Sequence, residues 1–527
     1  MNSRAQPTDA RRYDFVVCGA GSSGSVVARR LSDDPRVRVM LVEAGGSDDD
    51  PAVHTPQLWP TNVGSERDWA FRGEPDPGLD GRSILFSMGK VLGGGSSINV
   101  MVWARGHQKD WDAMASVARD ASWGYESVLD IYRKRIEDWH GVPDVERRGS
   151  GGPAYVAPPQ NPHPLPIAIV DAAAECGLST FDSPNGKMME SPAGAALSDL
   201  RVRDGKRESV FRSYVGPVAE RPNLTVVTRA DVLAVTFDGN SRATGVRILR
   251  DGRPQTVEAT EVILSLGAIN TPKVLMQSGV GDARMLRTHG IPIVQHLPGV
   301  GTNFHDHVGF SCIWESAEHV PVNPMSEATL YWPSEAGLDA PDLFACSLAI
   351  PLTTPQTEVL YGPTRAGWTL FGGLAQPASR GRVTLTGPDP HDPVRIEANM
   401  LSEPEDMRAA VECIRFLRHV GDAACLRPYV KHEVMPRALG RVELERYVRN
   451  AASTYWHEVG TARMGYDEMS VVGADLRVHG IEGLRIADGS ILPRITTGNT
   501  MAPCVVIGER AAELIATEHG LQRRGQR

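Results

Sequence analysis

A glycine-rich turn between a short apolar strand and an apolar helix places the tightest constraint on this fold. Residues 13–18 form a β-rich run, and apolar residues recur at helical spacing over residues 25–31. Between them stand the three glycines of a GxGxxG pattern, Gly19, Gly21 and Gly24. They serve a tight turn, close approach of the backbone to a pyrophosphate, and close helix–strand packing. Unpaired N–H groups at the helix start favour the same anion, so the arrangement predicts a dinucleotide-binding βαβ unit.

An acidic residue after the second strand refines this prediction. Residues 37–42 form that strand, and Glu43 follows it, nineteen residues beyond Gly24. An acid at this spacing accepts hydrogen bonds from a ribose diol, which disfavours a 2′-phosphate and therefore NADP. A glycine turn without a ligand is the alternative, but strand, helix and acid together favour nucleotide binding. The pattern does not separate NAD from FAD.

A second glycine cluster bears on that choice. Residues 89–99 read Gly-Lys-Val-Leu-Gly-Gly-Gly-Ser-Ser-Ile-Asn, with the apolar residues Val91, Leu92, Ile98 and Met101 in or beside the cluster. A flexible surface loop is the alternative interpretation. The apolar neighbours instead predict a buried loop whose backbone touches something flat or anionic, and a flavin with its diphosphate fits that description.

Composition excludes several function classes. The 527 residues carry a net charge of −9, without the clustered basic surface that nucleic acid or anionic membranes require. Seven cysteines are scattered without a CxxC pair, so neither a disulfide framework nor a zinc site is expected. Residues 1–12 are polar, and no stretch approaches the roughly 18 apolar residues of a transmembrane helix. We expect a cytoplasmic protein with no nucleic-acid partner and no transmembrane segment.

The order of expected elements indicates an α/β (α+β) chain with more than one domain. A β-meander with a returning strand is predicted to extend the nucleotide-binding half, with strands over residues 224–227, 232–235, 244–249 and 261–266. Residues 309–400 change to alternating strands such as 382–386, which indicates a second domain. Ser402 and Glu405 predict a capping box for the helix that follows.

Longer composite motifs, in order along the chain, resemble those of the glucose–methanol–choline (GMC) flavin oxidoreductases, in particular choline dehydrogenase-like and alcohol oxidase-like members. The matching runs are residues 89–99, 101–106, 267–281, 297–303, 457–461 and 487–493. The resemblance extends from about residue 13 to about residue 515, so it covers nearly the whole chain.

The resemblance implies a Rossmann-like FAD-binding domain, interleaved with a substrate domain built on an antiparallel sheet flanked by helices. We expect the FAD-binding domain at residues 12–150, 195–309 and 465–520, and the substrate domain at residues 151–194 and 310–464. The cofactor contacts expected from it are Gly19, Gly21, Ser22, Ser23, Gly24, Glu43, Ala44, Gly89, Val91, Gly94, Gly95, Ser97, Asn99, Val100, Val232, Asp488, Gly489, Asn499 and Thr500. Some relatives attach FAD through a histidine at the position of Ile98; isoleucine cannot form that bond, so non-covalent FAD is expected.

A catalytic pair also follows from the resemblance. His457 stands at the family's base position, and Asn499 at the position of a His or Asn that hydrogen-bonds the substrate oxygen. An alcohol gives up a hydride readily as its hydroxyl proton leaves, and a neutral imidazole beside the flavin can accept that proton. Trp456 either faces the substrate or fills the core. The commoner family form has proline where this chain has Glu458; if Glu458 points inward, we expect it to raise the pKa of His457.

The implied reaction is oxidation of a primary alcohol to an aldehyde by hydride transfer to flavin N5, with a quinone-like carrier or O2 as electron acceptor. Residues 310–400 hold ten acidic and four basic residues, which favours a neutral or cationic alcohol if they edge the cleft. A solvated acidic face explains the same count. A hydroxynitrile lyase-like enzyme that keeps FAD without turning it over, and a non-catalytic nucleotide-binding protein, are the alternatives.

A short histidine-rich run is the remaining candidate. His305 and His307 flank Asp306 where relatives have an Asp-His pair. No third or fourth ligand is spaced for a metal, so we expect no metal site. We interpret this run as packing near the domain junction.

Overall fold

The strand expected at residues 13–18 is β1 (Tyr13–Cys18), at the centre of a seven-stranded sheet. In the computed structural model, which describes residues 12–239, 241–317, 320–364 and 366–522, β1 pairs in parallel with β2 (Val39–Val42) and β13 (Arg253–Leu264). The other strands of this first sheet are β10 (Leu224–Val227), β11 (Ala230–Phe237), β12 (Ala243–Arg250) and β25 (Leu484–Ile486). β11, β12 and β13 form the expected antiparallel meander. β10 differs from the prediction, because it pairs in parallel with β2 at the opposite edge.

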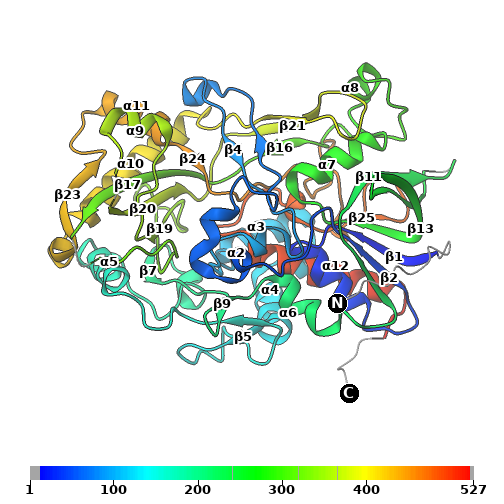
Figure 1. Cartoon of the computed structure of the whole chain (residues 1–527), viewed down its shortest axis with the longest axis horizontal. Coiled ribbons are helices and arrows are strands. Elements are labelled where there is room, and N and C mark those ends of the chain that lie inside the picture. The colour runs from blue at the N-terminus through cyan, green and yellow to red at the C-terminus, as the bar shows by residue number, and fades with distance from the viewer. Residues whose placement is uncertain (1–11, 240, 318–319, 365, 523–527) are drawn as a thin grey trace.

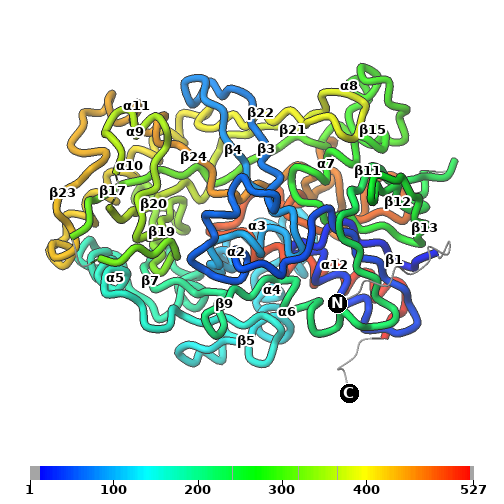
Figure 2. Tube along the Cα trace, in the orientation of Figure 1, coloured from blue at the N-terminus to red at the C-terminus, as the bar shows by residue number. Residues whose placement is uncertain are grey.

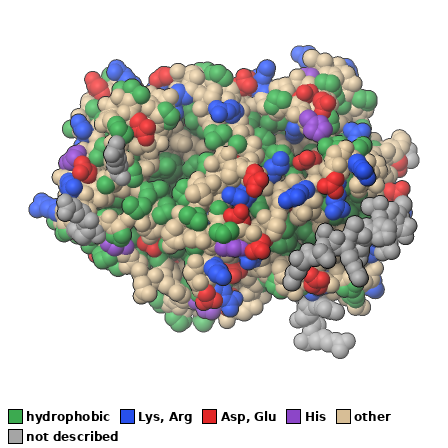
Figure 3. Space-filling view, in the orientation of Figure 1, with side chains coloured by type: hydrophobic (Ala, Val, Ile, Leu, Met, Phe, Trp, Pro, Cys, Tyr) green, Lys and Arg blue, Asp and Glu red, His purple; other side chains and the backbone are tan. Residues whose placement is uncertain are grey.

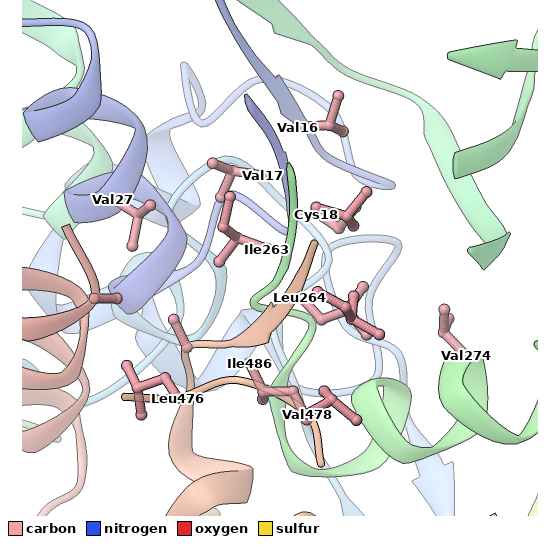
Figure 4. Packing of buried hydrophobic residues seen from close by; sticks show 14 of the residues in the cluster. Val16, Val17, Cys18, Val27, Ile263, Leu264, Val274, Leu476, Val478 and Ile486 are labelled. Carbon is pink, nitrogen blue, oxygen red and sulfur yellow. The ribbon is translucent and has the colours of Figure 1, made fainter. Parts of the chain in front are cut away.

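Helices cover both faces of the first sheet. α1 (Ser22–Leu31) packs against the C-terminal helix α12 (Met501–Glu518), where the Ser23 hydroxyl donates to the Cys504 carbonyl at 2.7 Å. α7 (Gly267–Gln277) lies on the other side, against β11. Figure 4 shows Val27 of α1 directed at buried strand residues such as Val17 and Ile263. This apolar packing fixes the turn between β1 and α1.

A second seven-stranded sheet is antiparallel throughout, as the resemblance implied. Its strands are β23 (Val430–Met435), β17 (Val308–Ser316), β20 (Gly367–Leu374), β19 (Leu343–Leu348), β18 (Ala328–Trp332) and β7 (Gly194–Leu197), with β24 (Ser453–Thr454) beside β17. The helices around it are α5 (Pro164–Glu175), α9 (Pro355–Tyr361), α10 (Pro404–Gly421) and α11 (Arg441–Ala451). Figure 1 shows this sheet at one end of the molecule and the first sheet at the other. The predicted fold class is confirmed.

The expected capping box at the start of α10 is wrong. The helix begins after Glu403, whose side chain makes no capping hydrogen bond. Pro404 occupies the first turn, where its missing N–H costs nothing. The buried Asp406 carboxylate instead accepts hydrogen bonds from the backbone N–H groups of Ala378 and Ser379, each at 2.8 Å. The acidic first turn therefore holds a neighbouring loop rather than its own helix.

Shorter elements surround and join the two sheets. The strands are β3 (Phe71–Arg72), β4 (Leu85–Phe86), β5 (Glu137–Trp139), β6 (Ala154–Val156), β8 (Val202–Arg203), β9 (Lys206–Arg207), β14 (Val280–Gly281), β15 (Gln295–His296), β16 (Thr302–Phe304), β21 (Gly381–Leu385) and β22 (Val394–Glu397). The helices are α2 (Pro51–His54), α3 (Gln108–Ala118), α4 (Tyr125–Ile131), α6 (Val210–Tyr214) and α8 (Ala283–Thr288). In Figure 2, blue, green and orange segments lie together at the first sheet, so early, middle and late parts of the chain build it jointly.

One domain boundary expected from the sequence does not coincide with the sheets of the structure. The boundary expected between residues 194 and 195 falls inside β7, which belongs to the second sheet.

On the face in Figure 3, lysine and arginine are interspersed with acidic residues rather than gathered into one patch. Within the described ranges no helix is long and apolar enough to cross a membrane, and all seven cysteines are free thiols.

Candidate active site

A cavity of about 250 Å³ is lined by segments that also build both sheets. Its lining brings together most of the residues expected from the sequence, namely Gly19, Gly21, Ser22, Ser23, Glu43, Ala44, Gly89, Gly94, Gly95, Asn99, Val100, Trp456, His457, Asp488, Gly489, Asn499 and Thr500. Ile98, at the position of the family's covalent histidine, lines it as well. Residues separated by more than 400 positions therefore face one space.

Four expected cofactor residues do not line the cavity: Gly24, Val91, Ser97 and Val232. Gly24 lies beneath the first turn, where an added Cβ would overlap the carbonyl oxygen of Gly19. The Val91 carbonyl accepts a hydrogen bond from the N–H of Gly94 at 2.8 Å, and Ser97 also bonds within this second glycine loop. Gly24, Val91 and Ser97 shape the loops from behind, whereas Val232 lies on β11, paired with Ile248 and outside this lining.

The two glycine loops touch each other at the cofactor end. A Cβ on Gly94, whose φ is +53°, would lie 2.8 Å from the Cα of Gly21. This approach sets the loops as two walls of one narrow cradle. The cradle lies at the start of α1, whose unpaired N–H groups favour a phosphate. The two backbones are in contact here, so a diphosphate fits against the edge that they form beside the start of α1.

Two buried carboxyl groups hold this end together. Glu43 accepts hydrogen bonds from the N–H groups of Ala20 at 3.0 Å and Gly45 at 2.8 Å, and burial raises its pKa to about 7. Asp488 accepts from the N–H of Gly267 at 2.9 Å, and burial raises its pKa as well. Glu43 fixes the first turn at the ribose position, while Asp488 ties the 267–281 motif to the cavity wall.

The other end of the cavity centres on His457, which is 8% exposed. Its Nε2 lies 3.1 Å from Asn499 Nδ2, and its Nδ1 lies 2.9 Å from His307 Nδ1. Its backbone N–H donates to the Asp306 carboxylate at 2.9 Å. The structure thus brings the expected pair together and adds His307 to it.

Hydrogen-bond chemistry fixes the proton positions on these two rings. His307 Nε2 lies 3.1 Å from the Ala375 carbonyl, which can only accept, so this nitrogen carries the proton. His307 Nδ1 is then a bare acceptor, and His457 Nδ1 must donate to it. The lone pair of His457 is left on Nε2, where Asn499 Nδ2 points. One backbone carbonyl thereby aims the basic nitrogen at the side where a substrate hydroxyl would lie.

Burial keeps these histidines neutral. It lowers the pKa of His457 to about 3 and that of His307 well below its usual range. The expected influence of Glu458 is therefore wrong. Its carboxyl lines the cavity and is 5% exposed, with neither oxygen hydrogen-bonded. Burial, followed by the nearby Asp306, raises the pKa of Glu458 well above its usual range, and burial rather than Glu458 governs the lowered pKa of His457.

The sequence interpretation missed the role of His307 and was closer for His305. His305 bonds the Asn303 carbonyl through Nδ1 at 2.7 Å and accepts from the N–H of Ile495 through Nε2 at 2.9 Å, which is a packing role. His307, two positions further along the chain, contacts His457. The sequence signal that could have indicated this contact is the Asp-His pair that the chain shares with relatives. In the described part of the chain, no cluster of three or more His, Cys, Asp or Glu side chains is arranged to hold a metal.

Aromatic side chains form the wall beside His457. The Tyr455 ring lies 4.2 Å from Phe371 and 4.6 Å from Phe344, and the Trp456 ring lies 6.3 Å from Trp59. Trp456 lines the cavity, and its indole N–H is buried without a partner. Its aromatic body therefore borders the space next to the base, with one hydrogen-bond donor to offer.

Charge on the cavity wall is acidic or absent. No lysine or arginine occurs among the described residues that line it. None of the described acidic residues in 310–400 lines it either, so their excess adds no negative charge to the cavity wall. Glu318 and Arg365, which belong to that count, lie outside the described residues. An anionic ligand would find no lysine or arginine side chain in the described part of this lining.

Comparison with known proteins decides the family. Models of the GMC oxidoreductase family match residues 13–309 and 377–508. The chain belongs to the GMC oxidoreductases. This GMC protein is 34% identical to the alcohol dehydrogenase (acceptor) of Pseudomonas putida, over 95% of this chain and 95% of that protein. It is 35% identical to an oxygen-dependent choline dehydrogenase of Rhizobium etli, over 97% of each.

A solved structure places the GMC protein among flavoproteins of the same fold. Pyridoxine 4-oxidase from Mesorbium loti superimposes with a TM-score of 0.91 and 28% identity, over 97% of this chain and 100% of that one. Formate oxidase from Aspergillus oryzae, a structure described by its FAD modification, gives a TM-score of 0.88 at 26% identity, over 98% and 100%. The chain is a flavoprotein with FAD as its cofactor, and the cradle between Gly21 and Gly94 fits that group.

Proposed function

We propose that this GMC oxidoreductase oxidises a primary alcohol to an aldehyde, with His457 as general base and Asn499 as the group that positions the alcohol oxygen. The observation that carries the proposal is the His307–His457–Asn499 chain, which leaves Nε2 of a neutral His457 imidazole without a proton, beside Asn499 Nδ2 at the cavity wall. Bound FAD supplies the hydride acceptor at flavin N5. The remaining roles belong to side chains of this protein.

Asn499 Nδ2 donates a hydrogen bond to the alcohol oxygen and holds it beside His457 Nε2. Nε2 accepts the hydroxyl proton as the substrate's hydride departs, so that no free alkoxide has to form. The resulting imidazolium donates through Nδ1 to His307, which stabilises its charge. The aromatic wall around Trp456 and Tyr455 excludes water and favours a substrate with an apolar or flat body.

The lining also narrows the substrate class. A neutral or cationic alcohol fits a wall without lysine or arginine, whereas an anionic one would lose its hydration without gaining a partner. The hydroxynitrile lyase-like alternative meets the same difficulty, since the described lining offers no lysine or arginine to a departing cyanide. A non-catalytic nucleotide-binding role would leave the ordered His457 tautomer unused. Ile98 cannot form a covalent bond to FAD, so the cofactor is held non-covalently and acid precipitation should release all the flavin.

Anaerobic addition of alcohols tests the reaction directly. The visible absorption of oxidised flavin should disappear with at least one neutral or cationic primary alcohol, such as an aromatic methanol or choline. If no alcohol in such a panel reduces the flavin, the proposal fails. The same panel, followed once by oxygen uptake and once with an artificial quinone, assigns O2 or a quinone-like carrier as the acceptor.

A further inference from the structure

A buried arginine without an acidic partner stands behind the second glycine loop. Arg207, at the end of β9, is 2% exposed. Its guanidinium donates to the Val53 carbonyl at 2.8 Å and to the Asn99 side-chain oxygen at 2.8 Å, while Nη2 has no partner. No carboxylate in the described part of the chain pairs with it. Burial alone lowers the pKa of Arg207 to about 9, and the group remains charged at neutral pH.

Other buried arginines of this protein form ion pairs, and Arg201, which does not, has Glu208 and Glu137 near enough to raise its pKa against the effect of burial. Arg105 pairs with Glu137, Arg148 with both Glu137 and Asp199, and Arg485 with Glu261. A buried charge without a counterion is strongly destabilising. The exception at Arg207 therefore calls for an anion that the polypeptide does not itself provide.

The contacts of Arg207 lead to the cofactor cradle. Asn99 and Ser96 both line the cavity, and Arg207 Nη1 reaches the Asn99 side-chain oxygen and, at 3.4 Å, the Ser96 carbonyl. The Asn99 oxygen also accepts from the N–H of Met101 at 2.9 Å. With both of these donors on its oxygen, Asn99 turns its NH2 group away from Arg207, towards Met501 at 3.3 Å on the cavity wall.

The same segment clamps the loop a second time. The N–H of Val210, three residues beyond Arg207, donates to the Ser96 hydroxyl at 3.0 Å. That hydroxyl donates in turn to the Gly93 carbonyl at 2.6 Å. The loop held in this way is the one in which Gly94 packs against Gly21. Arg207 thus places a positive charge behind the wall against which the diphosphate is expected to lie.

We infer that Arg207 is a positioning residue for FAD, and that the FAD diphosphate is the counterion that its buried charge lacks. Arg207 acts through Asn99 and the Gly93–Ser97 turn rather than by touching the phosphates. Its charge draws the diphosphate into the cradle, and its forked hydrogen bonds keep the loop in the shape that receives it.

Substitution of the charge, compared with a matched buried arginine, tests this assignment. Arg207→Gln removes the charge, and Arg207→Lys retains it. Arg201→Gln is the control, because Arg201 is 1% exposed with two unpartnered nitrogens in the described structure. Its side chain donates to Ser213 and lies over the Trp103 ring, and neither residue lines the cavity. FAD dissociation is measured by dilution of the purified holoenzyme, and ADP and adenosine serve as competitors for rebinding.

Arg207→Gln should weaken FAD about 30-fold or more, the usual cost of unpairing a buried charge. The affinity for ADP should fall by the same factor. The affinity for adenosine should fall by no more than about 2-fold, since adenosine lacks the diphosphate. The Arg201→Gln control should keep FAD within about 3-fold of wild type. Equal losses of ADP and adenosine, or equal losses in the Gln and Lys variants, would show a structural role only. A shifted flavin potential with unchanged FAD affinity would place the cation at the isoalloxazine ring and overturn the assignment.

Arg207→Lys adds a test that does not depend on the folding of the Gln variant. A buried lysine loses its proton at lower pH than a buried arginine. FAD release from Arg207→Lys should therefore accelerate between about pH 7 and pH 9, while the wild type stays constant. A flat profile in both proteins contradicts the inference. FAD release is measured without any alcohol, so its outcome is independent of the proposed reaction.

Discussion

The two ends of the cavity are built by different means. At the cofactor end, backbone approaches backbone: Gly94 meets Gly21, and Gly24 fits under Gly19. At the substrate end, side chains from loops next to two strands converge: His307 lies just before β17, and Tyr455 and His457 lie just after β24. A backbone site needs particular residues at fixed local spacing, whereas a side-chain site depends on which strands become neighbours. The first can be recognised in a sequence, and the second mostly cannot.

Replacement of His457 has the largest expected effect, and that effect should be confined to the substrate end of the cavity. His457→Gln should slow flavin reduction by alcohol about 10²–10⁴-fold, because no group is left to accept the hydroxyl proton. FAD content should stay unchanged, since the side-chain hydrogen bonds of His457 in the described structure join it to His307 and Asn499 rather than to the glycine loops. Anaerobic stopped-flow absorbance measures the rate, and the flavin-to-protein ratio serves as the control. Full turnover in this variant would remove His457 from the mechanism.

The converse substitution, at the cofactor end, should weaken FAD binding and leave the reaction step at His457 unchanged. In Gly94→Ala the new Cβ would lie 2.8 Å from the Gly21 Cα, at a φ of +53° that an alanine side chain disfavours. We expect FAD to bind about 100-fold more weakly, a cost of about 2.7 kcal/mol. Equilibrium titration with FAD measures it.

The control for this variant is Gly216→Ala, where the nearest atom to an added Cβ is 3.9 Å away. Enzyme saturated with FAD should reduce at nearly the wild-type rate in both variants. A Gly94→Ala protein that keeps its FAD but loses the rate would show that the two ends are not separable.

This difference explains what the sequence could predict. The β1–α1 turn, the glycine loops and Glu43 lie within short segments whose residue spacing predicts nucleotide binding. The antiparallel sheet of the substrate domain was expected only from the family resemblance. His307 could not be given its role, because its contact with His457 spans 150 positions and requires β17 to lie beside β24. The start of α10 was mispredicted for a similar reason, since Asp406 serves a loop that is distant in sequence.

Loss of the tautomer control should have an intermediate effect. His307→Leu removes the acceptor for His457 Nδ1–H, so the proton can move to Nε2 and block the base. We expect flavin reduction to slow about 10–100-fold, which is less than for loss of the base itself. His307→Asn offers a side-chain oxygen near the position of Nδ1 and should recover most of the rate. If Leu and Asn variants are equally slow, His307 contributes packing and not proton placement.

The smallest expected effect is on stability, and it comes from Glu458, a substrate-end carboxyl that pairs with nothing. Burial raises its folded-state pKa above the ordinary value of 4.5. The folded protein then holds a proton that the unfolded chain releases, so stability falls as pH rises from about 4.5 through the folded pKa. Glu458→Gln cannot titrate and avoids this loss. The variant should match the wild type in melting temperature near pH 4 and exceed it near pH 8, by about 1–3 kcal/mol in the free energy of unfolding. A difference that is equal at both pH values would mean that the pKa of Glu458 is the same in the folded and the unfolded protein, so that the carboxyl ionises in place and gives the substrate end a charged wall after all.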